Sequence, residues 1–167
     1  MVPLHEDQMK LAPVVFSACL AMTVSAFADS PQVPSAAVTP VVYDSANHLV
    51  GALLWQNEVS RKINGTYYWM NAVSDGLLKD AIFFYASTDC SGQAMIEDST
   101  GWYLLPYAIF DGHSVWGPTP GSEVGLNYQS YSFDGSCTQD AGYSRAAAAQ
   151  VIDSGKAAAL VPPFIVK

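Results

Sequence analysis

The stretch GHSVW at residues 112–116 comes closest in this sequence to a catalytic motif. It departs from the nucleophile elbow Gly-x-Ser-x-Gly at its last position, where Trp116 replaces the glycine that lets a strand and a helix approach closely. No helical pattern follows, and the chain is short for a hydrolase sheet, so the stretch favours a turn between two strands. No catalytic residue is assigned. A small secreted hydrolase using His113, with Asp111 or Ser114 beside it, is the alternative function.

Metal and cofactor sites are not indicated by the sequence. His48 and His113 both fall in predicted turns, and neither has a Cys or His at the spacing of a structural zinc site, which needs four ligands. The acidic residues show no Asp-x-Asp-x-Asp-Gly alternation, and carboxylates are ordinary formers of β-turns. We therefore expect no metal and no cofactor, with calcium binding and a glycosidase carboxylate pair as the weaker alternatives.

Aromatic side chains are the remaining candidates for recognition. Tyr67, Tyr68 and Trp69 are consecutive, and neighbours on a strand point to opposite faces, so some of these rings must point outward. Outward Trp and Tyr rings stack on sugars or anchor protein partners. We predict a binding surface for a carbohydrate or a surface protein formed by Tyr67, Tyr68, Trp69, Trp102 and Trp116. Cross-strand packing inside the fold is the alternative role for these rings.

The N-terminal segment has the pattern of a secretory signal peptide. Lys10 precedes an almost wholly apolar or small run at residues 11–27, which ends in Ala26-Phe27-Ala28. A cation, an apolar stretch and an Ala-x-Ala exit predict cleavage after Ala28, with residues 1–28 removed on export to the periplasm or the extracellular space. Met9 is an alternative start, because the residues before it carry negative charge where signal peptides carry positive charge.

Two membrane-bound alternatives compete with the signal peptide. The apolar run is shorter than the roughly 20 residues that span a bilayer, and it contains Pro13, so we expect no transmembrane segment in the mature chain. The sequence FSAC at residues 16–19 resembles a lipoprotein processing box, which would place a lipid on Cys19. The run continues well past Cys19, which argues against lipid anchoring.

Cleavage would leave an even number of cysteines. The chain has three, and removal of Cys19 leaves Cys90 and Cys137, which an oxidising compartment favours as a disulfide. The bridge would close a loop of about 47 residues, which the chain-entropy model values at about 4 kcal/mol. Two separate buried thiols are the alternative.

Composition limits the partners further. The 167 residues carry a net charge of −8, with no cluster of Lys or Arg along the sequence, which disfavours nucleic acid as a partner. Residues 29–40 contain three prolines among small polar residues and predict an extended linker. Residues 41–167 have the length of one domain.

Short apolar runs separated by turns predict an all-β fold, an antiparallel sandwich or barrel. The surest hairpin has its turn at Asn64-Gly65, because both residues tolerate the positive φ of a type I′ turn. Residues 81–86 are apolar without polar alternation, which predicts a strand covered on both faces. The sequence predicts a further hairpin around residues 111–114 and a strand at residues 127–133. At most short helical turns are expected near the C-terminus, at residues 156–160.

Three motifs resemble those of a group of small, uncharacterised exported bacterial β-domains. They are a Val-x-Asp…Val-Gly opening at residues 42–51, an Asp-Cys-x-Gly turn at residues 89–92 and a Pro-Pro-Phe ending at residues 162–164. The resemblance implies bacterial origin, export and a β fold. It assigns no activity and no catalytic residue. The sequence therefore favours an exported, non-catalytic β module with a binding or surface-structural role.

Overall fold

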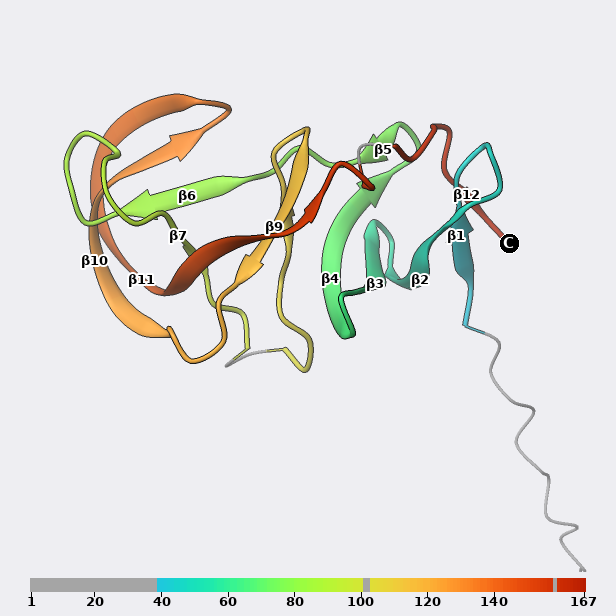
Figure 1. Cartoon of the computed structure of the whole chain (residues 1–167), viewed down its shortest axis with the longest axis horizontal. Helices are drawn as coiled ribbons and strands as arrows, with labels where there is room; N and C mark the ends of the chain where they lie inside the picture. The colour runs from blue at the N-terminus through green and yellow to red at the C-terminus, as the bar shows by residue number, and fades with distance from the viewer. Residues whose placement is uncertain (1–38, 101–102, 158) are drawn as a thin grey trace, which may run out of the picture. The chain divides into compact units, whose positions relative to one another are not determined.

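Strands dominate the part of the chain that this computed structural model describes, namely residues 39–100, 103–157 and 159–167 (Figure 1). The strands are β1 (Val41–Tyr43), β2 (Leu49–Trp55), β3 (Glu58–Ile63), β4 (Thr66–Val73), β5 (Gly76–Leu77), β6 (Ile82–Tyr85), β7 (Met95–Glu97), β8 (Ile109–Phe110), β9 (Ser114–Pro118), β10 (Val124–Phe133), β11 (Ser136–Ser154) and β12 (Ile165–Val166). None of these residues is α-helical, and all named strands pair antiparallel, so the predicted all-β class is confirmed.

The first sheet has the strand order β12-β1-β2-β3-β4-β5. Its central hairpin joins β3 and β4 through Asn64 and Gly65, whose φ angles are 49° and 91°. Positive φ at both turn residues matches the right-handed twist of the flanking strands, so the predicted hairpin is confirmed. The last strand of the chain lies beside the first, with Val166 opposite Val42.

The second sheet has the order β10-β6-β7-β11-β9-β8, and β10 pairs with β11 as well. The strands β10, β6, β7 and β11 therefore close into a ring, and β9 and β8 continue the sheet from β11. The 19-residue strand β11 pairs with β10, then with β7, and finally with β9 (Figure 1). The alanines at residues 146–149 lie inside this strand, because its neighbours on both sides override their helical preference.

Strand β6 differs from its predicted environment. Its apolar sequence predicts cover on both faces, but Ile82 is 39% exposed and the other three residues are half-buried. The face of β6 that carries Phe83 and Tyr85 lines an open hollow instead of packing against another layer, and Ile82 on the other face is also exposed.

The predicted disulfide is present. Cys90 and Cys137 are bonded at an S–S distance of 2.07 Å, with Cα atoms 5.9 Å apart. The bond links the turn after β6 to the start of β11, beside the strand β10 that lies between them. Within that turn, the N–H of Cys90 donates to the Oγ atom of Ser130, which is fully buried. The Cys90 turn is thus held by a hydrogen bond as well as by the covalent link.

The larger hydrophobic core lies between the two sheets. The first sheet contributes Val50, Val59 and Met70, and the second contributes Val115 and Ile152, all 9% exposed or less. Alternation along β4 explains the arrangement, since every second side chain from residue 68 to residue 72 points into this core.

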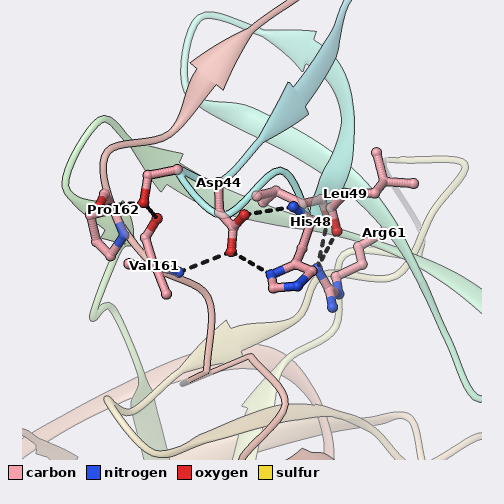
Figure 2. Close-up of polar contacts among 8 residues, drawn as sticks. Asp44, His48, Leu49, Arg61, Val161 and Pro162 are labelled. Carbon is pink, nitrogen blue, oxygen red and sulfur yellow. Dashed lines mark hydrogen bonds and ion pairs between the residues drawn. The ribbon is translucent and has the colours of Figure 1, made fainter.

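A polar cluster fastens the C-terminal segment to the first hairpin (Figure 2). The carboxylate of Asp44, whose side chain is fully buried, accepts hydrogen bonds from the backbone N–H groups of His48, at 2.6 Å, and Val161, at 3.1 Å. The Nδ1 atom of His48 lies 3.0 Å from the same carboxylate. The Oγ atom of Ser45 lies 2.9 Å from the carbonyl oxygen of Val161 and 3.0 Å from that of Pro162, and its single O–H can donate to either. Side chains of the first turn therefore hold the strand that ends the chain.

These contacts determine the acidity of Asp44. Burial alone would raise its pKa, but the hydrogen bonds from Val161 and His48 and the charge of the His48 ring outweigh burial and hold the pKa below its ordinary value of 3.8. The carboxylate is consequently ionised wherever the protein is folded near neutral pH.

The predicted helical turn at residues 156–160 is a single turn in which the N–H of Ala159 donates to the carbonyl of Gly155. Among the residues with described positions, no helix is long and apolar enough to span a membrane. The predicted signal peptide, the lipid alternative at Cys19 and residues 29–38 of the predicted linker lie outside the described residues.

Candidate functional site

The predicted aromatic set does not gather into one surface. Tyr68 is 7% exposed and belongs to the core, whereas Tyr67, on the opposite face of β4, is 52% exposed. The Nζ atom of Lys62 lies 5.4 Å from the centre of the Tyr67 ring. Trp102 lies outside the described residues. The period of two along the strand has separated neighbouring rings.

Trp69 belongs to an aromatic stack that covers the outer face of β4. Its ring stacks on Tyr107 with centroids 4.1 Å apart and meets Tyr103 at 5.2 Å. The Nε1 atom of Trp69 is buried without a hydrogen-bond partner in the described part of the chain. Tyr107 in turn donates to Asp80 and accepts from Asn71, so this stack joins the two sheets. These rings therefore pack the two sheets against each other.

Trp116, by contrast, lines an open hollow of about 360 Å³ in the second sheet. The apolar lining consists of Ala81, Phe83, Tyr85, Ala94, Trp116 and Phe133. The polar lining consists of Lys79, Asp111, His113, Ser132 and Asp134. Four aromatic rings and a polar rim in one concavity form the best candidate for a ligand site in the described residues.

Strand alternation places the rings of β6 in this hollow. Ala81, Phe83 and Tyr85 are two residues apart and share one face of the strand. In the neighbouring strand β10, Ser132 lies opposite Phe83, and its Oγ atom is 3.3 Å from the hydroxyl of Tyr85. Side chains of the neighbouring strands β6 and β10 therefore form the base of the hollow.

Two turns supply the polar rim. In the turn between β10 and β11, Asp134 and Gly135 both have positive φ, and Asp134 forms an ion pair with Lys79. The other turn joins β8 to β9 and contains Asp111 and His113. Residues far apart in the sequence thus meet at the mouth of the hollow.

Asp111 orients Trp116. Its Oδ1 atom accepts the N–H groups of His113 and Ser114, both at 2.7 Å, and its Oδ2 atom accepts the indole Nε1–H of Trp116 at 2.7 Å. Burial would raise the pKa of Asp111, but these hydrogen bonds and the nearby His113 outweigh it and lower the pKa. The Trp116 ring also meets Phe83 edge-to-face at 5.1 Å. The ring is therefore held in one orientation.

The residues of the hydrolase alternative do not form a nucleophile–base pair in this structure. His113 is exposed, and its ring makes no hydrogen bond with Asp111 or Ser114 in the described part of the chain. The oxygens of Asp111 are already used by two backbone groups and an indole. Ser114 pairs with Ser154 as the first residue of β9. The geometry is that of a turn that positions a tryptophan.

Three rings of the hollow, Phe83, Tyr85 and Phe133, were not among the residues predicted from the sequence. Phe83 and Tyr85 lie in the apolar run at residues 81–86, whose sequence predicts a strand covered on both faces. Ala81, Phe83 and Tyr85 occupy every second position of that run, but the positions between them hold Ile82 and Phe84, which are apolar too. Because residues on both faces are apolar, the sequence does not show which face of the strand lines the hollow.

Across the described ranges, no three His, Cys, Asp or Glu side chains are placed to share a metal ion. Comparison of the chain with protein-family models, with curated proteins and with solved structures gives no match. The resemblance to exported bacterial β-domains therefore stays a prediction.

Proposed function

We propose that this protein is an exported, non-catalytic binding module and that its ligand site is the hollow lined by Phe83, Tyr85, Trp116 and Phe133. The observation that carries the proposal is the convergence of these four rings on one open concavity with a polar rim. Export is supported by the leader-like N-terminal sequence and by the Cys90–Cys137 bond, which an oxidising compartment maintains.

A carbohydrate fits this hollow best among the ligands predicted from the sequence. Aromatic rings stack on the apolar faces of sugar rings, and hydroxyl groups need hydrogen-bond partners at the edges. Asp134, Ser132 and His113 supply acceptors and donors at the rim. The volume of about 360 Å³ suits a small ligand rather than the broad surface of a protein partner.

A glycan array followed by calorimetry with the purified, disulfide-bonded protein tests the proposal. We expect a sugar to bind and the Phe133→Ala variant to bind it about tenfold more weakly, since a contacting ring contributes about 1–2 kcal/mol. Phe133 is suitable because it is 46% exposed, so its removal spares the core. Tyr143→Ala is the matched control, because Tyr143 is 70% exposed on β11 and does not line the hollow.

Three outcomes would overturn this assignment. They are an array without any bound glycan, equal loss of binding in Phe133→Ala and Tyr143→Ala, and hydrolysis of a bound glycan that His113→Ala abolishes. The last would replace binding with the hydrolase alternative.

A further inference from the structure

The positive charges of this acidic protein are unevenly distributed. Of the seven Lys and Arg residues, Lys10 lies outside the described part, and Lys79 and Arg145 form ion pairs with carboxylates. Lys167, in the last strand region, donates to the side-chain oxygen of Asn47. Arg61, Lys62 and Lys156 form no ion pair with any residue whose position is described, and all three line one hollow of about 240 Å³. This hollow is separate from the aromatic one.

The two walls of the hollow are joined by a hydrogen bond. One wall is the end of β3 with its turn, and the other is the end of β11 with the turn after it. The Nδ2 atom of Asn64, in the first wall, donates to the carbonyl of Ile152, in the second, at 2.7 Å. Ile63 and Ile152 are buried at 6% and 9% exposure. The cations therefore project from backbone that is held in place.

The guanidinium of Arg61 is held in place by hydrogen bonds, but no carboxylate in the described part of the chain neutralises its charge. Its Nη1 atom donates to the carbonyl oxygens of Leu49, at 3.1 Å (Figure 2), and Val50, at 3.0 Å. Carbonyls are neutral acceptors, so they fix the guanidinium while its net charge and its other donors stay available. A guanidinium in a fixed position is suited to bind an oxyanion through paired N–H groups.

The lysines are likewise without acidic partners. Lys62 lies over the neutral ring of Tyr67, as described above. The lining contains one carboxylate, Asp153, whose Oδ1 atom accepts the backbone N–H of Lys156 at 3.2 Å. Three cations and one carboxylate leave a local excess of positive charge in a chain of net charge −8. An anion in the hollow would relieve the repulsion among the cations.

We propose that the hollow lined by Arg61, Lys62 and Lys156 binds an oxyanion, the phosphate or carboxylate group of a small ligand. Arg61 supplies directional donors, and Lys156 supplies charge at the hollow. Lys62 adds charge from the outer face of β3, where its Nζ atom lies over Tyr67. Binding here is independent of the aromatic hollow, so either proposal can fail without the other.

Amide NMR titrations of the disulfide-bonded protein test this site, with inorganic phosphate and glucuronate as probes and sodium chloride at equal ionic strength as the reference. We expect the amide signals of Asn64 and Asp153 to shift and to saturate by about 10 mM in at least one probe. Phosphate and glucuronate distinguish a phosphate from a carboxylate as the preferred group.

A pair of charge-matched variants makes the test specific. Lys62→Gln/Lys156→Gln removes two charges at the hollow, and Lys79→Gln/Lys167→Gln removes two charges elsewhere. We expect the first variant to lose at least tenfold in affinity and the second to bind as the unmodified protein does. Shifts that do not saturate, shifts that chloride reproduces, or equal losses in the two variants would overturn the proposal.

Discussion

The carboxylate of Asp44 accepts a hydrogen bond from the backbone N–H of Val161, which lies 117 residues further along the chain. The contact is buried and joins the turn after β1 to the segment that leads into β12. Because this carboxylate also binds His48, one ionised group holds both the first turn and the last strand.

Stability should therefore fall in acid through Asp44. A carboxyl whose pKa is lower in the folded state than in the unfolded state stabilises the fold above its unfolded pKa, here near 3.8, and this contribution disappears as the pH falls through the lower folded value. We expect the urea midpoint to be constant from pH 7 to about pH 5 and to drop below about pH 4. Asp44→Asn should lower the midpoint at pH 7 and flatten the acid decline. Asp140→Asn is the control, because Asp140 is exposed; an equal effect there would contradict the prediction.

Loss of the disulfide should destabilise the protein strongly. The bond between Cys90 and Cys137 spans 47 residues, and in the chain-entropy model a loop of this size contributes about 4 kcal/mol. We expect Cys90→Ala/Cys137→Ala to lower the free energy of unfolding by about 2–5 kcal/mol in urea titrations. The unmodified protein under reducing conditions should behave in the same way. Unfolding curves that coincide with that of the oxidised protein would show that the loop is constrained by other contacts.

Two glycines should respond differently to alanine. A Cβ atom at Gly51 would lie 2.4 Å from the carbonyl oxygen of Ser60 in the neighbouring strand, so the backbone must move. At Gly65 the surroundings are open and only the positive φ of 91° opposes a side chain. We expect Gly65→Ala to cost about 1 kcal/mol and Gly51→Ala about 2–3 kcal/mol in chemical unfolding. The reverse order would contradict the close approach of β2 and β3.

Removal of the Asp111 carboxylate should release Trp116. In Asp111→Asn the side-chain oxygen can still accept the N–H groups of the turn, but an amide nitrogen cannot accept the indole N–H. We expect a loss of about 1–3 kcal/mol and faster hydrogen exchange of the Trp116 indole N–H, measured by NMR. Asp134→Asn, which breaks only the exposed ion pair with Lys79, should change stability by less than about 1 kcal/mol. Unchanged indole exchange in Asp111→Asn would show that Phe83 alone holds the ring.

Local chemistry explains the features that the sequence predicted correctly. The turn at Asn64 and Gly65 follows from the φ angles these residues tolerate. The disulfide joins the two cysteines that lie outside the predicted signal peptide. Strand order does not follow from local chemistry. The pairing of Val42 with Val166 depends on contacts such as Asp44 to Val161, which involve side chains with no distinguishing pattern in the sequence.

The candidate site was predictable only in part. Trp116 was predicted, but its companions come from β6 and β10, and the curl that brings them together arises from the double pairing of β10 with β6 and β11. Consecutive rings such as Tyr67 and Tyr68 suggested a patch, whereas strand alternation sends them to opposite faces. Whether aromatic rings share a surface therefore depends on the strand face that each ring occupies, and not on how close the rings are in the sequence.

The pairing of β12 with β1 also bears on how the chain acquires its structure. Val42 and Val166 are neighbours in the sheet although almost the whole domain separates them along the chain. Closing so long a loop costs entropy before the contacts that stabilise the pairing can form. Proteins rich in such pairings therefore fold slowly, in roughly milliseconds to seconds. The first sheet cannot reach its full width until β12 has been synthesised and has paired with β1.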